Sequence, residues 1–206
     1  WIGTDGQGLI QLYHYDSLFE TVHTSHPVRC FCEDEDGNIL IGTKGSGIKL
    51  LNPATKELTD YLNESKGLIS NSVYALRRNK ANDIFIGTEG TGINILNAAT
   101  GRLEKLEIPD KYPPFKAVYN IYFTNNDSLY GGTSGYGLIK INISREQGRY
   151  HVKGFRQYNS SDKNISLNND VVYAITSDPE DNMLWFGTRG GGLNCINMKD
   201  NSIKSL

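Results

Sequence analysis

Apolar and polar positions along the chain follow a pattern that recurs five times. Each copy has two apolar or aromatic residues, then Gly-Thr, one variable residue, Gly-x-Gly, and a second run with alternating apolar positions. The copies read WIGTDGQGLIQL, ILIGTKGSGIKLL, IFIGTEGTGINIL, LYGGTSGYGLIKI and LWFGTRGGGLNCIN. The Gly-Thr pairs follow one another at nearly regular steps, beginning at Gly3, Gly42, Gly87, Gly132 and Gly187. This recurrence predicts a structural repeat, because a nucleotide site would need only one glycine-rich loop.

A second apolar segment precedes each Gly-Thr pair from the second copy onward. Its leading valine stands at a nearly constant offset before the glycine of the pair, at Val28, Val73, Val118 and Val172. Residues rich in Asn, Asp and Gly separate the two segments, at 36–38, 82–83, 125–128 and 181–182. Short apolar runs joined by such residues predict β-hairpins.

A fourth short segment completes the unit. It follows turn signals at 52–55 and 97–101, and it begins near Glu57, Arg102 and Asn201. No stretch has a sustained helical period of apolar residues. Four short strands repeated about every 40 to 55 residues predict an all-β fold of β-propeller blades, each a four-stranded antiparallel meander.

The repeats divide the chain into five blades of one β-propeller fragment. We expect a partial blade over residues 1–24, which begins at its second strand, and full blades over 25–68, 69–113, 114–167 and 168–206. If the parent propeller has seven blades, five blades cannot close the ring. Bare blade faces favour association. We therefore expect that the isolated chain either forms a homodimer or is the ordered part of a longer chain.

The composition of the middle strands and turns fits this arrangement. Runs such as 39–41 and 184–186 are apolar at every position, which predicts strands covered on both faces. The Gly-x-Gly turns supply positive φ angles and let neighbouring blades approach, and we expect the threonine to bond a backbone group there.

Blade four departs from the template, with Gly131 before its Gly-Thr pair and a long outgoing segment over 143–169. Such an insertion lies either on the functional face or in a tolerated surface loop.

Charge and titratable residues narrow the function. The net charge of −2 gives no support for a nucleic-acid partner. No apolar run approaches the length of a membrane span.

The titratable residues offer no clear chemical site. The spacing of the three cysteines does not indicate a disulfide framework, and we expect all three to be small buried residues: Cys30, Cys32 and Cys195. The pair His23 and His26 has no third ligand, and the acidic run 33–37 lacks the spacing of a calcium loop. We therefore predict no catalytic residues, no metal and no cofactor.

A ligand, if one binds, would meet the end of the propeller where the glycine-rich turns and the starts of the first strands lie together. Aromatic rings with convergent amides and charges suit a sugar, although a repeating tyrosine is also typical of a blade-to-blade core. The candidate ligand-binding residues are Asn71, Asn169 and Asp170 before the first strands, Lys44, Glu89, Tyr136 and Arg189 in the turns, and Arg29, Tyr74, Tyr119 and Tyr173 on the first strands.

The repeats resemble those of a known protein family. The segments NDVVYAITSD, LWFGTRGGGLNCIN, GLISNSVYAL and NPATKELTDYL are similar to the two-component regulator propeller repeat, and the resemblance covers essentially the whole chain. Blade one lacks its first strand, and blade two has Pro27-Val28-Arg29 in place of Asn-x-Val-Tyr, so those two blades match less well.

The resemblance implies a periplasmic sensor region of a bacterial hybrid two-component system, joined through a membrane helix to a histidine kinase. It also implies an oligosaccharide ligand, with the remaining blades and adjacent sensor domains of the parent chain as partners. No kinase, receiver or DNA-binding part is expected in these residues, nor direct membrane contact. Two other functions stay open, because propellers host many functions: an enzyme such as a lyase acting on a sugar or cyclic ester, and a non-catalytic scaffold.

Overall fold

The computed structural model describes residues 1–4, 8–12, 19–90, 92–125, 127–162, 167–178, 180 and 182–206. These residues form antiparallel sheets, with one 3-10 turn at Glu64–Lys66. The all-β prediction is confirmed. The predicted turn residues Asn126 and Asp181, and the first glycine-rich turn at 5–7, lie outside the described residues.

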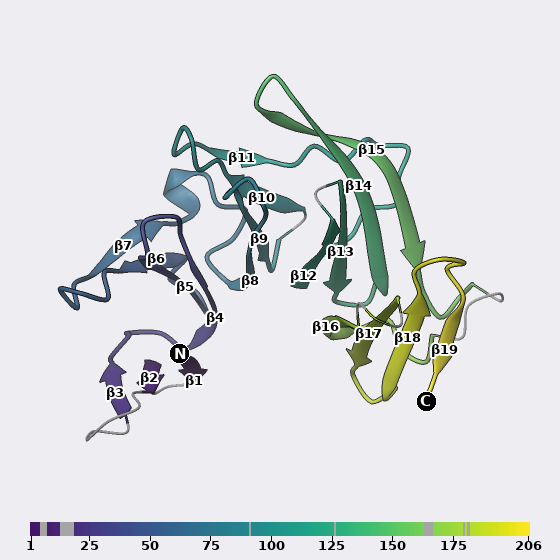
Figure 1. Ribbon diagram of the computed structural model, residues 1–206, viewed down its shortest axis with the longest axis horizontal. Coiled ribbons are helices and arrows are strands. Elements are labelled where there is room, and N and C mark those ends of the chain that lie inside the picture. Colours follow the sequence, from purple (N-terminus) through teal and green to yellow (C-terminus); the bar gives the residue numbers. More distant parts are fainter. Residues whose placement is uncertain are drawn as a thin grey trace. The chain divides into compact units, whose positions relative to one another are not determined.

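The chain folds as two compact units. Unit 1 comprises Trp1–Glu89 with Ile93–Glu104, and unit 2 comprises Gly90–Gly92 with Lys105–Leu206, so the main boundary falls between Glu104 and Lys105, within β11. Within every sheet the neighbouring strands follow chain order, which makes each sheet a meander (Figure 1).

Unit 1 holds three sheets. The first contains β1 (Ile2–Thr4), β2 (Gly8–Leu12) and β3 (Phe19–Val22). The second contains β4 (Val28–Glu33), β5 (Ile39–Thr43), β6 (Ile48–Leu51) and β7 (Leu58–Leu62). The third contains β8 (Val73–Arg78), β9 (Ile84–Thr88), β10 (Ile93–Leu96) and β11 (Leu103–Lys105).

Unit 2 holds two sheets. The first contains β12 (Val118–Asn125), β13 (Ser128–Thr133), β14 (Leu138–Glu146) and β15 (Arg149–Tyr158). The second contains β16 (Val172–Asp178), β17 (Met183–Thr188), β18 (Leu193–Asn197) and β19 (Ile203–Ser205). Each of the five sheets lies inside one of the residue ranges that the repeats delimit.

Apolar cores join neighbouring sheets within each unit. In β5, Ile39 and Ile41 pack with Leu9 of the first sheet, while Leu40 packs with Val73 of the third. Every residue of β5 and of β9 is buried, as the uninterrupted apolar runs predict. In unit 2 the core between the two sheets is built from Tyr130, Leu138, Tyr158, Leu167, Val172, Ile175, Leu184, Phe186 and Ile196.

Strand β17 differs from the other middle strands. Leu184 and Phe186 are buried in the core of unit 2, but Met183 and Trp185 are only half-buried. The expectation that 184–186 is covered on both faces is therefore wrong for Trp185. The reason is that unit 2 places a sheet against only one face of β17.

The long outgoing segment of blade four is a pair of strands over much of its length. Strand β14 continues past Ile143, whose N–H donates to the carbonyl of Asp127 at 2.8 Å, and residues 143–146 pair with 149–152 of β15. This hairpin extends beyond the β12–β13 turn, at the end of the sheet opposite to the glycine-rich turn at 134–137. Its tip therefore lies away from the candidate ligand-binding end.

Candidate functional site

The glycine-rich turns have a backbone that requires glycine. Gly45 and Gly47 have φ angles of 100° and 70°, and Gly135 and Gly137 have 83° and 74°. Side chains disfavour this left-handed region. A Cβ on Gly47 would also lie 2.2 Å from the carbonyl oxygen of Leu62. The second glycine of the motif therefore serves both the turn and the close passage of the fourth strand.

In the Gly-Thr pairs at 42–43 and 132–133, the threonine closes the same turn. Thr43 Oγ1 donates to the carbonyl of Gly47 at 2.8 Å, and Thr133 Oγ1 donates to that of Gly137 at 2.7 Å. Both threonines are fully buried, so each bond satisfies a polar group that water cannot reach. The expectation that the threonine bonds a backbone group is confirmed.

The amides of the turns bind the next sheet. The N–H groups of Gly45 and Gly47 donate to the carbonyl of Asn71, at 3.1 and 2.8 Å. Likewise, the N–H groups of Gly135 and Gly137 donate to the carbonyl of Asp170, at 3.0 and 2.8 Å. These are the donors that a phosphate cradle would use. In both turns the chain itself occupies them.

The glycine of the Gly-Thr pair forms the other half of this contact. A Cβ on Gly42 would lie 2.8 Å from Cγ1 of Val73, and a Cβ on Gly132 would lie 3.0 Å from Cγ1 of Val172. Gly3 stands in the same relation to Val28, at 2.9 Å. We call these two contacts together a blade joint. In it, the glycine of the Gly-Thr pair lies against the leading valine of the next sheet, and the two turn amides donate to the carbonyl two residues before that valine. The prediction that glycine lets neighbouring blades approach is confirmed.

A β-bulge follows the valine in each four-stranded sheet. The register between the first and second strands shifts after Val28, Val73, Val118 and Val172. The residue skipped by the pairing is Arg29, Tyr74, Tyr119 or Tyr173, which are the four first-strand candidates. A bulge re-aims the side chain of its extra residue and is frequent beside functional sites.

The bulges bring candidate residues together within each unit. In unit 1 the guanidinium carbon of Arg29 lies 5.8 Å from the ring centroid of Tyr74, which is within cation–π distance. In unit 2 the rings of Tyr119 and Tyr173 lie 5.2 Å apart and are tilted by 35°. Tyr173 keeps 49% of its surface exposed. Exposed rings beside a cation can stack on the apolar face of a ligand and bond its hydroxyls.

The polar candidates before the first strands have local roles. Asn71 Oδ1 accepts a hydrogen bond from the N–H of Glu64 at 2.8 Å. The carboxylate of Asp170 accepts bonds from the N–H and Oγ of Ser160, at 2.6 and 2.7 Å. Asn169 Oδ1 accepts from its own turn, at the N–H of residue 171, at 2.9 Å. These side chains shape the strand starts instead of converging with the rings.

The charged turn candidates are exposed. The N–H groups of Lys44, Glu89 and Arg189 donate to the carbonyls of residues 27, 72 and 171, which precede the first strands of their own sheets. Their side chains remain exposed at this end of the sheets. Tyr136 is half-buried, and its carbonyl accepts from Nε2 of Gln157 at 2.8 Å. These turn residues lie at the end of the sheets where the first strands begin, whereas the bulge that forms the ring pairs leaves no sign in the residue pattern.

The three cysteines differ in burial, and they do not join other side chains in a described metal site. Burial raises the pKa of the Cys30 and Cys32 thiols, yet both residues are only half-buried, in contrast to the fully buried Cys195. The expectation of three buried cysteines is therefore wrong for two, because β4 has one covered face. Among the residues that the structure describes, no three His, Cys, Asp or Glu side chains are grouped to hold a metal.

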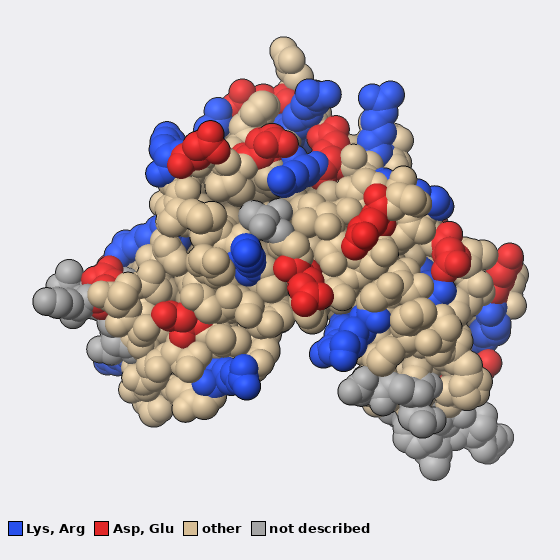
Figure 2. Space-filling view, turned by 180° about the vertical axis from the view of Figure 1, so that it is seen from behind, with Lys and Arg blue, Asp and Glu red and all other residues tan. Residues whose placement is uncertain are grey.

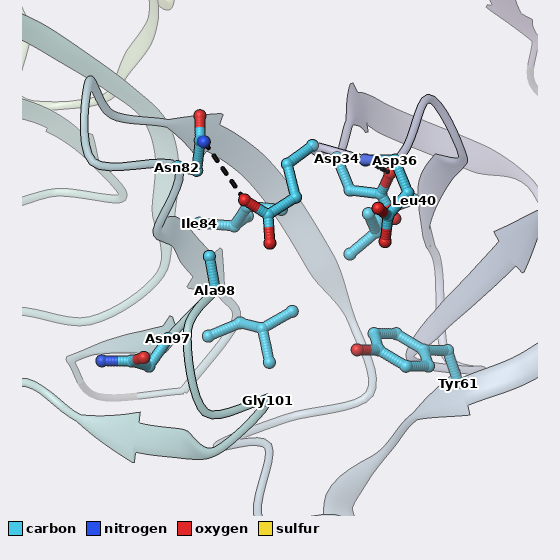
Figure 3. A pocket seen from close by; sticks show the side chains of 11 residues that line it. Asp34, Asp36, Leu40, Tyr61, Asn82, Ile84, Asn97, Ala98 and Gly101 are labelled. Atoms are coloured by element: carbon cyan, nitrogen blue, oxygen red, sulfur yellow. Dashed lines mark hydrogen bonds between the residues drawn. The ribbon is translucent and has the colours of Figure 1, made fainter.

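A small cavity in unit 1 lies at the opposite end of the sheets from the candidate residues. Its volume is about 100 Å³, and the acidic turn, Tyr61 and Asn82 line it (Figure 3). Asp34 Oδ1 accepts bonds from the N–H groups of Asp36 and Asn38, at 2.9 and 2.8 Å. Asn82 Nδ2 donates to the neighbouring Glu35 carboxylate at 3.2 Å. These bonds give the carboxylates roles in the turn and in the contact between two sheets.

Basic and acidic side chains are interspersed on the face shown in Figure 2. Among the described residues, no helix is long and apolar enough to cross a membrane.

Comparison with known proteins defines the class of fold. Residues 24–45, which include β4, β5 and the start of a glycine-rich turn, match the family model of the two component regulator propeller. This is the family that the repeats resemble. No curated protein sequence matches the chain.

Solved structures share the fold at low sequence identity. The extracellular domain of BT3049 from B. thetaiotaomicron, assigned to the hybrid two component systems, is 18% identical with a TM-score of 0.54, over 98% of this chain and 31% of that one. PorZ, a surface component of the type-IX secretion system of Porphyromonas gingivalis, is 15% identical with a TM-score of 0.65, over 99% and 32%. Virginiamycin B lyase from Staphylococcus aureus is 15% identical with a TM-score of 0.62, over 92% and 58%. The chain is a fragment of a larger β-propeller.

Proposed function

We propose that this chain is part of the periplasmic, ligand-sensing propeller of a hybrid two-component system and that its ligand is an oligosaccharide. The two-component regulator propeller match and the likeness to the BT3049 extracellular domain support the class of protein. The observation that supports a ligand site is the bulge after each leading valine. It places Arg29 beside Tyr74 and Tyr119 beside Tyr173 on first strands.

The chemistry of these pairs suits a sugar. A pyranose ring has an apolar face that stacks on an aromatic ring and hydroxyls that need hydrogen-bond partners. Tyrosine supplies both the ring and a hydroxyl, and Arg29 supplies donors with no acceptor. Binding transmits a signal only if the ligand prefers one of two states of the sensor. The kinase that reads those states would lie elsewhere in the parent protein.

The likeness to virginiamycin B lyase keeps an enzyme as the alternative. Acid–base chemistry on a cyclic ester or sugar would need histidine, arginine and glutamate side chains that converge on one face. The four bulged residues are one arginine and three tyrosines, a set that favours binding over catalysis. A scaffold, in which the chain contacts only other domains, would need none of these side chains to meet solvent.

Thermal unfolding of the purified chain with a panel of plant and microbial oligosaccharides tests the proposal. A ligand at ten times its Kd stabilises the folded state by about 1.4 kcal/mol, which raises the melting temperature by a few degrees. Tyr119→Ala and Tyr173→Ala should each remove that shift. Tyr150→Ala is the matched control, because Tyr150 lies on β15 in the extended hairpin, far along the sheet from the bulge.

Two results would contradict the proposal. A flat response across the whole panel rejects an oligosaccharide ligand for this chain. A shift that survives in Tyr119→Ala, in Tyr173→Ala and in Tyr74→Ala rejects the bulged rings as the site. Chromatography of the incubated sugars separates the enzyme alternative, because a lyase would convert its substrate whereas a sensor returns it unchanged.

A further inference from the structure

A second cavity lies between the two sheets of unit 2. Its volume is about 430 Å³, which is within the range of small-molecule sites. Strands β12, β13 and β14 and the turn at Asp127 supply most of its lining, and Asn182 and Met198 of the last sheet supply the rest. Asp127 and Asn182 belong to the turns between first and second strands. The cavity is therefore at the end of the sheets opposite to the glycine-rich turns and the bulged rings.

Blade four has polar residues in this cavity at positions where the other four-stranded sheets are apolar. Tyr130 of β13 and Lys140 of β14 both line it and lie directly opposite each other. The equivalent pairs of the other four-stranded sheets are Leu40 and Leu50, Phe85 and Ile95, and Trp185 and Cys195. A phenol and an ammonium group that break the repeat in this way indicate a role that the fold alone does not require.

The Tyr130 side chain is buried without a hydrogen-bond partner. The residue is 1% exposed, and its hydroxyl has no partner among the described residues. By contrast, the hydroxyl of the neighbouring Tyr158 donates to Oδ1 of Asn201 at 3.2 Å. Burial raises the pKa of Tyr130, so its hydroxyl keeps the proton. A buried polar group without a partner lowers stability, and a leucine at this position, as at Leu40, avoids that loss.

Two cations lie near Tyr130 without a counterion. Lys140 is directly opposite Arg156 of β15. The Lys140 ammonium lies 5.4 Å from the ring centroid of Tyr130. The Arg156 guanidinium carbon lies 4.8 Å from the ring centroid of Tyr158. Neither cation forms an ion pair with any described residue. Like charges directly opposite each other destabilise a sheet, so an anion between them would convert repulsion into attraction.

We propose that this cavity binds a hydroxylated carboxylate, such as a sugar acid, with its carboxylate at Lys140 and Arg156. Lys140 is half-buried and Arg156 is exposed, so a ligand from solvent can reach both. A guanidinium matches the two oxygens of a carboxylate, and the ammonium adds a further charged donor. Asn142 and Asn182 supply amide groups for the hydroxyls of the ligand. We call these four residues and the cavity beside them the acid site.

Other ligands fit these residues less well. Asp127, which is exposed, is the only acidic residue among the described residues that line the cavity. Lys140 and Arg156 together with Asp127 therefore leave one positive charge, which matches a single carboxylate. A neutral sugar would leave the two cations facing each other, and a small inorganic anion would leave the amides without ligand contacts. This inference does not depend on the oligosaccharide proposed for the bulged rings.

The methionine methyl groups report occupancy of the acid site. The chain has two methionines, of which Met198 lines the cavity. Met183 alternates with the core residue Leu184 and so lies on the other face of β17. In NMR spectra of the full chain with isotope-labelled methionine methyls, titration with galacturonate at constant ionic strength should shift the Met198 signal to saturation and the Met183 signal far less. Galactose has the same ring without the carboxylate, and acetate has the carboxylate without the ring, so each should produce only a small shift.

Lys140→Met tests the charge of the acid site. The change keeps the length of the side chain and removes the ammonium, so the apparent Kd for galacturonate should rise by about 10-fold or more. Because the equivalent residues Leu50 and Ile95 are apolar, the variant should melt at the same temperature or a higher one. Lys116→Met is the matched control, because it removes the same charge from an exposed residue outside the cavity, and it should leave the Kd unchanged.

Three results would overturn the proposal. The first is a galacturonate titration without a saturable shift of the Met198 signal. The second is an equal shift with galactose or with acetate, because the site would then not recognise the carboxylate or the hydroxyls. The third is a folded Lys140→Met variant that binds galacturonate as tightly as Lys116→Met does. None of these results affects the proposed sensing site, whose Tyr119 and Tyr173 are tested separately.

Discussion

Replacing Gly42 by alanine should destabilise unit 1, whereas the same change at Gly187 should not. Both residues are the glycine of a Gly-Thr pair, and neither has a positive φ. A Cβ on Gly42 would lie 2.4 Å from Sγ of Cys30 and 2.8 Å from Cγ1 of Val73, against nothing within 4 Å at Gly187. Carbon atoms in good contact are about 3.5–4.0 Å apart, so the joint would have to open by about 1 Å.

The size of the effect follows from how little the neighbours can move. Val73 is fully buried and β-branched, so rotation about χ1 offers no escape. Overpacking of this kind costs about 1–3 kcal/mol, and an uncrowded substitution stays within about 0.5 kcal/mol. Urea unfolding measures both variants, and amide exchange of β5 and β8 assigns the loss to unit 1. The double variant Gly42→Ala with Val73→Ala should lose less stability than the sum of the two single variants, because the smaller side chain at position 73 makes room for the added methyl group.

Equal stability changes at Gly42 and Gly187 would refute this reasoning. So would a double variant whose loss of stability equals or exceeds the sum of the two single losses, because additive losses would mean that alanine at position 42 does not crowd Val73.

Two further predictions concern the turn and an ion pair. Thr43→Ala should cost about 1–3 kcal/mol in urea unfolding, because it removes the buried hydroxyl that donates to the carbonyl of Gly47 and accepts from the N–H of Ser46, and leaves that carbonyl only the N–H of residue 43. Thr43→Ser should recover most of that loss, and equal losses in the two variants would contradict the role of the hydroxyl. The hydrogen bond and charge of Lys49 lower the pKa of Asp60. The ion pair of Asp60 therefore contributes its full stability above the pKa of this carboxyl in the unfolded chain, about 3.9. That contribution is lost as the pH falls through the lower pKa of the folded state. Asp60→Asn should flatten stability against pH between about pH 5 and 2, and an unchanged acid slope would reject the pairing.

The sequence predicts the blades well because the motif encodes the joint itself. Gly42 and Gly132 must be glycine for the valine of the next sheet to approach, and Thr43 must carry a hydroxyl for the turn. The fixed spacing from valine to glycine places both strands of the hairpin. Features that follow from local backbone and neighbour contact are therefore visible in the residue pattern.

Other features depend on backbone partners or on what covers a strand. The carbonyls of Asn71 and Asp170 bind the glycine amides, but a carbonyl leaves no mark in the side-chain pattern. The bulge at Tyr119 is likewise a matter of pairing register. The run through Trp185 is as apolar as the run through Leu40, yet only the latter has a sheet on each face. The long insertion of blade four extends strands β14 and β15, and this pairing is likewise not evident from the residue pattern.

The glycine-rich turns at 44–47 and 134–137 join blades through the amides that a bound phosphate would need. Amide hydrogen exchange of the unmodified chain, measured with and without a nucleoside triphosphate, tests this role of the turns. The blade-joint account predicts slow exchange at Gly45, Gly47, Gly135 and Gly137, with no change when the nucleotide is added. Fast exchange at these four amides that slows on addition of the nucleotide would contradict it.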